Sequence, residues 1–575
     1  MVPYRWEQEV CDDEAAGELA RAAGVDPAVA RLLILRGIAD AESARRFLHP
    51  SLDHLHDPMR LAGMREAVDR LLKAVASGER IAVHGDYDVD GITATVILRR
   101  TLELLGGEVV HFVPDRMKDG YGLNAPAIER LHAEGARVVV SVDCGIRGAE
   151  AARRAKDLGV DLIITDHHEP DEDLPPALAV VNPKRRDCTY PDKNLAGVGV
   201  ALKLVQALTA RGGRGTWLPA FVKIAAIGTL ADVVPLVGEN RVIARLGLEQ
   251  LSKGPHKAGL RALIESAGLA GKPIDSYHVS FMLAPRVNAA GRMSSPDLAL
   301  RLLLAADDGM IEEARALAGQ LNAENERRQQ EERAILAEAR KVVETDPDVG
   351  ARAALVVAGD GWHRGVIGIV ASRLVDAFHR PVVVISIDGD TAHGSCRSIP
   401  GFDMLEALTA CSAHLDQYGG HRAAAGLTIH RSRIRAFRED LTRWADDRLG
   451  PDDLRPRLRL DGRLGFRQIT PRLFEGLSQL APFGVGNPKP MFWTPSAQVA
   501  DGPRRLKERH LSMSLRHDGV ALRGVFWRAA DRAAEIAAAR EGLDVAYTIE
   551  RNTFNGTTTL ELTLADVRTP GAVAP

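Results

Sequence analysis

Short apolar runs alternate with amphipathic segments through the first half of the chain. Between residues 80 and 183, five runs are rich in Val or Ile, namely RIAVHGDYD, EVVHFVPD, RVVVSVDCG, DLIITDHH and LAVVNP. Helical patterns, such as the one from Ala149 to Leu158, separate several of these runs. Strands that are apolar on both faces and separated by helices are typical of a parallel sheet covered on both sides. We therefore expect an α/β domain over residues 56–310, after a polar, helical N-terminal extension over residues 1–55.

The pattern changes at about Ile311. The segment LNAENERRQQEERAILAEARKVVE has almost no apolar face in its first half, and it contains neither Gly nor Pro. A helix that is polar all round usually bridges domains through solvent. The segment therefore predicts a long connecting helix over residues 311–347, with a length of about 45–50 Å at 1.5 Å per residue. The alternative is a helix that lies on a domain surface.

The second half of the chain predicts two further domains. AALVVAG, a helical pattern from Gly365 to Phe378, PVVVISID and TAHGSCRS indicate a second α/β domain over residues 348–450, which ends at the linker LGPDDLRPR. Residues 451–575 alternate apolar and polar positions in HLSMSLRH, ALRGVFW, DVAYTIE and TTLELTLADV. The helical DRAAEIAAAR lies between the third and fourth strands if AQVADG is the first. Five short strands with that helix position predict an OB-fold β-barrel.

Length and charge agree with several domains and leave room for a nucleic-acid partner. A chain of 575 residues exceeds the roughly 250–300 residues at which single cores stop growing. The 74 basic and 77 acidic side chains nearly cancel, which excludes a polycationic coat but not a local basic groove. Residues 451–510 carry 11 basic and 6 acidic side chains, which favours a strand-binding groove in the barrel. An ordinary charged surface is the alternative.

Cysteine usage and hydropathy favour a cytoplasmic protein without membrane association. The five cysteines include no C-x-x-C pair, which suits a reducing compartment. The first residues, MVPYRWEQEVCDDE, lack a basic region followed by an apolar run, so we expect no signal peptide. The most apolar long stretch, from Leu218 to Val237, contains Lys223 and Asp232. Both would be costly inside a bilayer, so we interpret this stretch as a buried helix.

The densest chemical signal is HGDYDVDG, at the end of the first expected strand. It places His84, Asp86, Asp88 and Asp90 within seven residues. Carboxylates this close repel one another, and a bound divalent cation removes that repulsion. Alternate residues of an extended strand end point the same way, so we expect these four side chains to converge. A polar turn without a metal is the alternative.

Three other segments supply matching groups. Asp143 follows RVVVSV, Asp166-His167-His168 follows DLIIT, and Asp232 lies inside the apolar helix, in GTLADVVPL. Open α/β sheets place their sites at the carboxyl ends of strands, and a buried Asp is costly unless it has a partner such as a metal. The donors are carboxylates and imidazoles without a thiolate, which favours Mn²⁺ or Mg²⁺ over a structural zinc. They suffice for two ions that share a bridging carboxylate.

These residues carry a resemblance to a known family. The order His84-x-x-x-Asp88-x-Asp90, Asp143, Asp166-His167-His168 and Asp232 resembles the DHH phosphoesterase superfamily. APRVNAAGRM, GSCRS and GGHRAAAG are similar to segments of the RecJ family of single-stranded-DNA-specific exonucleases within it. The resemblance spans roughly residues 50 to 570. It implies a parallel-sheet DHH catalytic domain, a long helix, an α/β DHH-associated domain and a C-terminal OB fold.

The resemblance also implies roles for the metal-centre residues. His84, Asp88 and Asp143 would hold one ion, and the other would be held by Asp90, Asp143, His167 and Asp232, with Asp143 bridging. His168 would contact the scissile phosphate and stabilise its developing charge, with a third metal ligand as the alternative. Asp86 and Asp166 would orient His84 and the neighbouring imidazoles, which makes Asp86 part of the catalytic group.

Substrate contacts are implied in both α/β domains. Ser395 and Arg397, which we expect on a turn after a strand, would form a pocket for a 5′-phosphate. Arg116 and Arg286 would make further phosphate contacts, and His421 in the GGH turn would contact the substrate. Cys396 stands where the family often has Gly or Ala, and a thiol is small enough for that position.

The implied function is exonucleolytic. The chain would degrade single-stranded DNA with a 5′ phosphate to mononucleotides, 5′→3′, by two-metal hydrolysis, in DNA repair and recombination. It would act as a monomer, with a helicase and a single-strand-binding protein as partners, and the strand would enter between the two α/β domains. One alternative is a DHH phosphodiesterase for cyclic dinucleotides or short oligonucleotides, which the OB fold and long helix disfavour. Another is a replication scaffold with a degenerate site, which the complete set of Asp and His residues disfavours.

Overall fold

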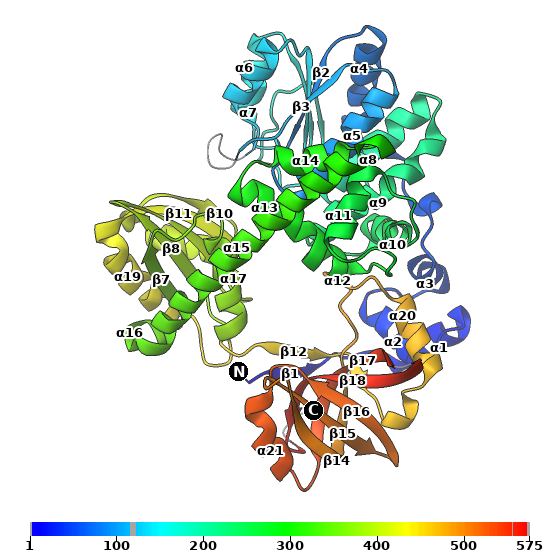
Figure 1. Ribbon diagram of the computed structural model, residues 1–575, viewed down its shortest axis with the longest axis vertical. Helices are drawn as coiled ribbons and strands as arrows, with labels where there is room; N and C mark the ends of the chain where they lie inside the picture. Colours follow the sequence, from blue (N-terminus) through cyan, green and yellow to red (C-terminus); the bar gives the residue numbers. More distant parts are fainter. Residues whose placement is uncertain (1–2, 116–121, 555, 572–575) are drawn as a thin grey trace. The chain divides into compact units, whose positions relative to one another are not determined.

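The computed structural model describes residues 3–115, 122–554 and 556–571 (Figure 1). They form two compact units, which we treat one at a time. The N-terminal unit contains Cys11–Asn325 and Arg472–Lys489, and the C-terminal unit contains Met1–Val10, Glu326–Pro471 and Pro490–Pro575. The domain boundaries expected from the sequence stay a prediction.

A parallel sheet forms the centre of the N-terminal unit. Its order is β3-β2-β4-β5-β6, and every neighbouring pair is parallel. The strands are β2 (Ile81–Gly85), β3 (Val109–Phe112), β4 (Val138–Val142), β5 (Asp161–Thr165) and β6 (Ala179–Val181). Helices pack on both faces (Figure 1): α4 (Met64–Ala76), α5 (Val89–Leu104) and α8 (Gly197–Arg211) on one, α6 (Ala125–Ala133) and α7 (Ala149–Asp157) on the other. The expected doubly covered parallel sheet is confirmed.

The rest of this unit is helical. The N-terminal extension forms α1 (Asp13–Ala23), α2 (Pro27–Leu35) and α3 (Ala41–Leu48). A second apolar core collects α9 (Leu218–Ala231), α10 (Gly238–Lys253), α11 (Ala258–Ser266), α13 (Ala284–Met293) and α14 (Asp297–Leu304). The short helix α12 (Ser276–His278) has no buried residue.

One helix expectation is wrong at its end. The apolar helix stops at Ala231, so Asp232 is its C-cap rather than an internal residue. Val233 follows in a left-handed conformation with φ of 62°. Pro235 lies just beyond and cannot continue a helix, and it also disfavours helical backbone in the residue before it. Asp232 therefore lies at a helix end, where its carboxylate can face other segments.

The long helix is present as a single element, α15 (Ile311–Thr345), but it is not polar all round. Its first half buries Ala314, Leu317 and Leu321 in the core of the N-terminal unit. Its second half, in the C-terminal unit, buries Ile335, Ala339 and Val343. In that unit Trp362 Nε1 donates to Glu338 at 2.8 Å. The expectation of a solvated bridge is therefore wrong for both ends, because small and aliphatic residues spaced along each half form a narrow buried stripe.

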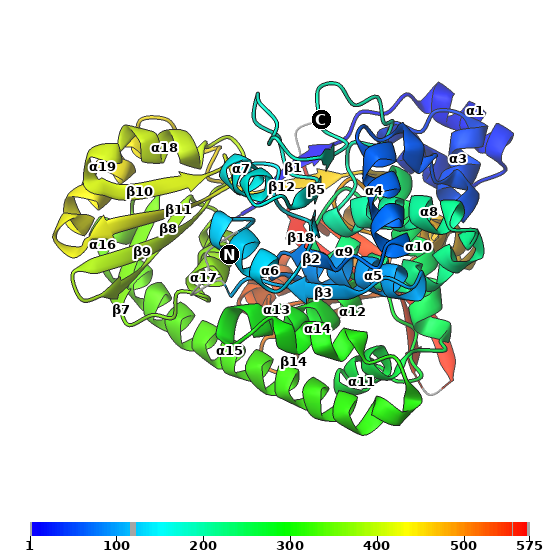
Figure 2. The same cartoon turned by 90° about the horizontal axis from the view of Figure 1, so that it is seen from above.

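The second α/β domain has a mixed sheet. The order is β10-β11-β9-β8-β7, and only the pair β7–β8 is parallel. The strands are β7 (Leu355–Asp360), β8 (Val382–Asp388), β9 (Thr391–Arg397), β10 (Leu415–Gly420) and β11 (Ala424–His430). Helices α18 (Met404–Ala410) and α19 (Ile434–Asp446) pack on one face, and Figure 2 shows α17 (Ile367–Phe378) on the other.

The C-terminal residues form a closed five-stranded barrel. The strands β14 (Phe492–Leu506), β15 (His510–His517), β16 (Val520–Phe526), β17 (Leu543–Phe554) and β18 (Thr557–Arg568) pair in the order β14-β15-β16-β18-β17, and β17 closes onto β14. Helix α21 (Ala533–Ala538) lies between the third and fourth strands, so the expected OB fold is confirmed.

The sequence pattern did not predict the partner of the first residues. Strand β1 (Arg5–Gln8) pairs in parallel with β12 (Arg457–Leu460). Across this pair Glu9 binds Arg459, and Glu7 lies 3.7 Å from Arg457. Part of the basic surplus of residues 451–510 is therefore neutralised by the start of the chain.

In the part of the chain that the structure describes, no helix combines the length and the apolar character needed to cross a membrane.

Candidate metal centre

The HGDYDVDG segment forms a strand, a tight turn and the start of a helix. Strand β2 ends at Gly85, and Asp88 caps α5 by accepting from the backbone N–H groups of Asp90 at 2.9 Å and Gly91 at 3.1 Å. A Cβ atom at Gly91 would lie 2.5 Å from the Asp86 carbonyl oxygen, so the turn needs glycine there. The carboxylates therefore converge because the chain turns, and the expected alternation along an extended strand is wrong.

Helix α13, which contains the APRVNAAGRM motif, supports this turn. Asn288 Oδ1 accepts from Val89 N at 3.1 Å. Gly291 lies under Tyr87, where a Cβ would approach the Tyr87 carbonyl oxygen to 2.8 Å. Neither Asn288 nor Gly291 was predicted from the sequence, because their function depends on a contact with a segment about 200 residues away in the chain.

The start of α8 contacts two of the carboxylates. Gly197 N donates to Asp90 Oδ2 at 2.7 Å, and Val198 N donates to Asp90 Oδ1 at 2.8 Å. A Cβ at Gly197 would lie 2.3 Å from Asp143 Oδ1, so only glycine allows this approach. Asp143 follows β4 and has φ of 61°, a left-handed conformation that is uncommon for a non-glycine residue. Gly197 was not predicted from the sequence, where its only signal is the small-residue run LAGVGV.

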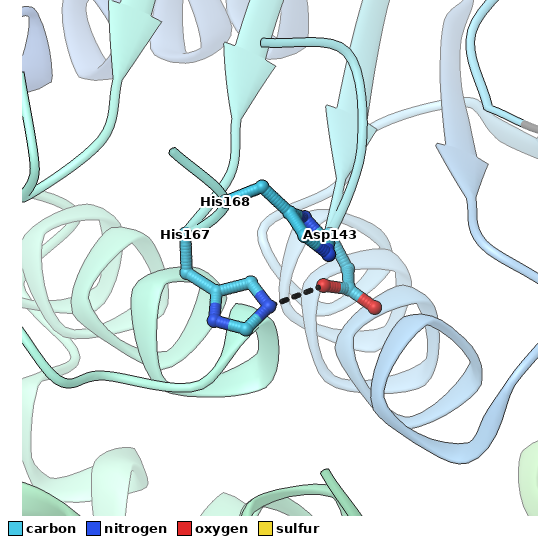
Figure 3. A group of neighbouring side chains, drawn as sticks. All are labelled: Asp143, His167 and His168. Atoms are coloured by element: carbon cyan, nitrogen blue, oxygen red, sulfur yellow. Dashed lines mark ion pairs between the residues drawn. The ribbon is translucent and has the colours of Figure 1, made fainter. Parts of the chain in front are cut away.

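His167 lies among three carboxylates. Its Nε2 is 3.2 Å from Asp143 Oδ1, 3.7 Å from Asp232 Oδ2 and 4.0 Å from Asp90 Oδ2. Figure 3 shows the His167 ring pointing toward the Asp143 carboxylate, with His168 on the same loop. The four residues come from the ends of β4, β5 and α9 and from the first turn of α5, so the structure brings together residues that the sequence spreads over more than 140 positions.

Asp166 holds the ring of His168. Its Oδ1 accepts from His168 Nδ1 at 2.7 Å, and its Oδ2 accepts from Ile146 N at 2.9 Å. Burial opposes protonation of His168, but the hydrogen bond to Asp166 and the negative charges of Asp166, Asp86 and Asp90 together raise the pKa of His168. Burial alone would raise the pKa of Asp166, yet the same hydrogen bond lowers it. The His168 side chain is 40% exposed, so it can reach a substrate from this fixed position.

Four other carboxylates of the centre have strongly perturbed acidities. Burial, reinforced by Asp88, raises the pKa of Asp86 to about 7 and that of Asp232 to about 8. Burial and neighbouring carboxylates raise the pKa values of Asp90 and Asp143 well above the ordinary range. Burial lowers the pKa of His167 to about 4, which leaves its imidazole neutral near pH 7. A neutral imidazole among crowded buried carboxylates is an arrangement that a divalent cation stabilises.

The donor set fits Mn²⁺ or Mg²⁺. Among the described residues, Asp143 Oδ1, His167 Nε2 and Asp232 Oδ2 are buried and have no hydrogen-bond partner. Candidate ligand atoms lie within 4.8 Å of one another in three groups: Asp143, His167 and His168; Asp90, His167 and Asp232; Asp86, Asp88 and Asp143. Oxygen donors with imidazole and without thiolate suit these ions. Asp143 and His167 each belong to two of these groups, and the bridging role of Asp143 stays a prediction.

His84 and Asp86 differ from the expected arrangement. Asp86, which we expected to orient His84, contributes an atom to the group with Asp88 and Asp143, whereas His84 belongs to none of the three groups found among the described residues. His84 is fully buried, with its ring against Phe112 and its Nδ1 3.6 Å from Cys144 Sγ. The ligand role of His84 and the orienting role of Asp86 stay predictions.

The expected substrate residues are divided between the units. Arg116 lies outside the described residues. Arg286, on α13 in the N-terminal unit, donates through Nε to Asn322 Oδ1 at 3.1 Å. Ser395, Arg397 and His421 lie in the C-terminal unit, and His421 is exposed at the turn between β10 and β11.

Ser395 and Arg397 lie on a strand, and the expected turn is wrong at this point. Both belong to β9, which pairs with β8 and β11. Alternation along the strand places them on one face, with Cys396 buried on the other. Gly368, in the first turn of α17, lies against them, because a Cβ there would meet Ser395 Oγ at 3.0 Å and Arg397 Nη2 at 3.3 Å. A hydroxyl and a guanidinium beside a helix N-terminus suit an anion.

Family models match three parts of the chain. The DHH family, N-terminal domain, matches residues 80–229, and the DHHA1 domain matches residues 351–447. The RecJ OB domain matches residues 460–566. These matches fall on the parallel-sheet domain, the mixed-sheet domain and the barrel.

Named relatives match most of the chain. The single-stranded-DNA-specific exonuclease RecJ of Bacillus subtilis is 41% identical over 522 residues, which are 90% of this chain and 65% of that protein. The protein of the same name from Escherichia coli is 33% identical over 574 residues, which are 95% of this chain and 96% of that protein. The chain therefore spans slightly less than two thirds of the B. subtilis relative and nearly all of the E. coli relative.

Solved structures agree with these matches. The crystal structure of RecJ in complex with Mn²⁺ from Thermus thermophilus has a TM-score of 0.84 and 35% identity, and the match covers 99% of this chain and 80% of that chain. The corresponding Mg²⁺ complex has a TM-score of 0.79 and 33% identity, with 99% and 79% covered. By sequence along almost its whole length, and by its fold, the chain belongs to the RecJ family of the DHH superfamily.

Proposed function

We propose that the chain is a metal-dependent exonuclease that degrades single-stranded DNA from the 5′ end to mononucleotides, in DNA repair and recombination. One observation carries the proposal: aspartates and histidines from four separate segments meet in a buried centre with crowded carboxylates. The relatives named as single-stranded-DNA-specific exonucleases supply the substrate class.

The centre would take Mn²⁺ or Mg²⁺, the ions with which the Thermus thermophilus relative forms its two complexes. Asp90, Asp143, His167 and Asp232 would hold one ion. Asp88 and Asp143 would hold a second, together with Asp86 or with His84 as the family resemblance implies. When bound, two such ions activate a water and stabilise both the attacking and the leaving oxygen of an in-line phosphoryl displacement.

The chain's own groups prepare the site for that chemistry. Asp166 accepts a hydrogen bond from His168 Nδ1 and favours the protonated imidazole by raising its pKa, so His168 can neutralise charge on the scissile phosphate. The α8 N-terminus donates two hydrogen bonds to Asp90 and fixes both of its oxygens. Burial of Asp143 and His167 excludes bulk water, which strengthens every electrostatic contact at the centre.

Ser395 and Arg397 would bind the 5′-phosphate beside the N-terminus of α17. A dedicated phosphate pocket would explain degradation from one end. No nucleotide precedes a terminal 5′-phosphate, so protein groups can surround it on that side, which they cannot do at an internal phosphate. Arg116 and Arg286 would contact further phosphates, and His421 would contact the strand.

The proposal extends to the cellular setting. The chain would be a cytoplasmic monomer, and a helicase and a single-strand-binding protein would supply and protect its substrate. Sedimentation at working concentrations tests the monomer, and pull-down with a purified single-strand-binding protein tests that partner. A stable dimer, or the absence of binding, would contradict the corresponding statement.

A labelled degradation assay tests the function directly. Oligonucleotides labelled at the 5′ or 3′ end, single- or double-stranded, are incubated with Mn²⁺, Mg²⁺ or a chelator. We expect a 5′ label to appear at once as mononucleotide, a 3′ label to produce a descending ladder, and duplex and chelator controls to stay intact. Cleavage confined to dinucleotides and trinucleotides would indicate a small-substrate phosphodiesterase, and strand binding without cleavage would indicate a scaffold.

A further inference from the structure

Asn240 is a fully buried amide between two backbone segments that carry metal-centre residues. It lies in the first turn of α10. Its Nδ2 donates to the carbonyl oxygens of Asn194 at 2.5 Å and Pro235 at 3.1 Å, and its Oδ1 accepts from Ala196 N at 3.4 Å. One side chain thus connects the segment before α8 with the segment after Asp232.

The first of these segments sets the position of the donors to Asp90. Ala196, which binds Asn240, is followed directly by Gly197 and Val198, whose N–H groups donate to the two oxygens of Asp90. Gly197 also packs against Asp143 with no room for a side chain. A displacement of the segment at Ala196 would therefore move the two N–H donors of Asp90 and would push Gly197 against Asp143.

The second segment holds a strained backbone next to Asp232. Val233 has φ of 62°, a conformation that is a true outlier for a β-branched residue. Its side chain is 67% exposed, so little packing of its own holds it there. Strain of this kind persists only where surrounding contacts over-determine the backbone. The bond from Asn240 to Pro235 and the bond from Leu236 N to Val485 O at 2.8 Å are such contacts.

We infer that Asn240 is a positioning residue of the metal centre, which keeps the Asp90 side and the Asp232 side at the separation that ion binding requires. The inference rests on the metal centre proposed above. In this role Asn240 contacts neither an ion nor DNA. It acts through its hydrogen bonds to the backbone of Ala196 and Pro235.

Metal binding by the full-length chain tests this role without relying on catalysis. Isothermal titration with Mn²⁺ is compared for wild type, Asn240→Ala and Leu263→Ala. Leu263, on α11, is fully buried in the apolar core of the later helices and its side chain makes no hydrogen bond, so we expect its truncation to lower stability. We expect Asn240→Ala to weaken Mn²⁺ binding by about 10- to 100-fold, the usual effect of losing a group that supports metal ligands. Leu263→Ala should lower the melting temperature and leave the Kd unchanged.

A double-mutant cycle with Val233 separates positioning from general stability. Glycine adopts positive φ without strain, so in Val233→Gly the backbone beside Asp232 no longer needs the Asn240 bond to stay in place. We therefore expect the loss of Mn²⁺ affinity caused by Asn240→Ala to be smaller in the Val233→Gly background. Equal losses in the two backgrounds would contradict the route through Val233.

The outcomes distinguish this inference from the proposed function. If wild type binds no Mn²⁺, the metal centre itself is wrong. If wild type binds Mn²⁺ and Asn240→Ala binds it equally well, the centre stands and the role of Asn240 is refuted. Should Asn240→Ala fail to fold, Asn240→Ser can be used instead, because its shorter side chain keeps one hydroxyl that can donate a hydrogen bond. It should show an intermediate loss of affinity, and a wild-type Kd in that variant would also refute the role.

Discussion

At the scale of single residues, Asp143 is the test of the centre, because it belongs to two of the three ligand groups. Asp143→Asn keeps the side-chain shape and removes the charge. Several kcal/mol of transition-state stabilisation depend on such a ligand, so Mn²⁺-dependent cleavage should fall by about 100-fold or more. Strand binding, measured by fluorescence anisotropy in chelator, should be retained. Unchanged cleavage by this variant would refute the bridging role.

Asp166 controls the charge of His168, and this is also testable. Because the hydrogen bond and the charge of Asp166 help to hold the pKa of His168 above its ordinary value, Asp166→Asn should lower that pKa, and only the more distant charges of Asp86 and Asp90 then oppose the effect of burial. The protonated fraction of His168 near neutral pH should fall. NMR titration of the imidazole signals in metal-free protein measures this. Asp440→Asn, which removes the partner of His414, is the matched control and should leave the His168 titration unchanged.

At the scale of elements, the crowded carboxylates link metal binding to pH. Folded-state pKa values of about 7 for Asp86 and about 8 for Asp232 lie above that of an unfolded aspartate. Between the pKa of an unfolded aspartate, about 4, and these folded-state values, the folded metal-free chain binds more protons than the unfolded chain. Its stability therefore falls as pH rises from about 4 to about 8. Bound Mn²⁺ offsets the repulsion, so the increase in melting temperature on adding Mn²⁺ should be larger at about pH 9 than at about pH 6. Asp143→Asn should show a smaller dependence, and a pH-independent increase would contradict the linkage.

The strand β9 and the helix α17 carry the proposed 5′-phosphate pocket. Arg397→Ala should reduce the preference for a 5′-phosphorylated over a 5′-hydroxyl strand more than it reduces general binding, because the guanidinium acts on the terminal phosphate. Competition between the two strands measures the preference. Arg435→Ala, an exposed arginine on α19, is the control. Equal losses for both strands would argue against a dedicated pocket.

Helices and strands with a regular pattern of apolar residues could be predicted from the sequence. Contacts between segments that are distant along the chain could not. The five Val- and Ile-rich runs and the Asp or His residues at their ends predicted β2 to β6 and most of the centre. We expected Ser395 and Arg397 on a turn after a strand, but pairing with β8 and β11 makes this segment a strand. Gly197, Gly368 and Asn240 matter through contacts with segments far along the chain, which no local pattern contains.

At the scale of the whole molecule, the order of domains along the chain does not match the compact units. Residues Arg472–Lys489, from the part that we assigned to the OB fold, belong to the N-terminal unit. The buried Arg241 donates there to the carbonyl oxygens of Leu480 at 2.9 Å and Gln479 at 3.1 Å, as well as to Phe47. Deleting residues 451–575 would leave this guanidinium buried without those acceptors, which is strongly destabilising. A truncation is therefore a poor test of the barrel.

Point substitutions in the intact chain test strand binding by the barrel. Arg505, Arg509 and Arg528 are exposed near the β14–β15 turn and the end of β16, where Arg509 and Arg528 line a cavity of about 610 Å³. Each arginine that neutralises a phosphate of a single strand contributes about 0.7 to the slope of log K against log salt, so replacing all three by alanine should reduce that slope by about 2. Anisotropy in chelator over a series of salt concentrations measures the slope, with Arg435→Ala as control. An unaltered slope would mean that this face of the barrel does not hold the strand, and the basic surplus of the C-terminal segment would then serve contacts within the protein, as Arg459 does with Glu9.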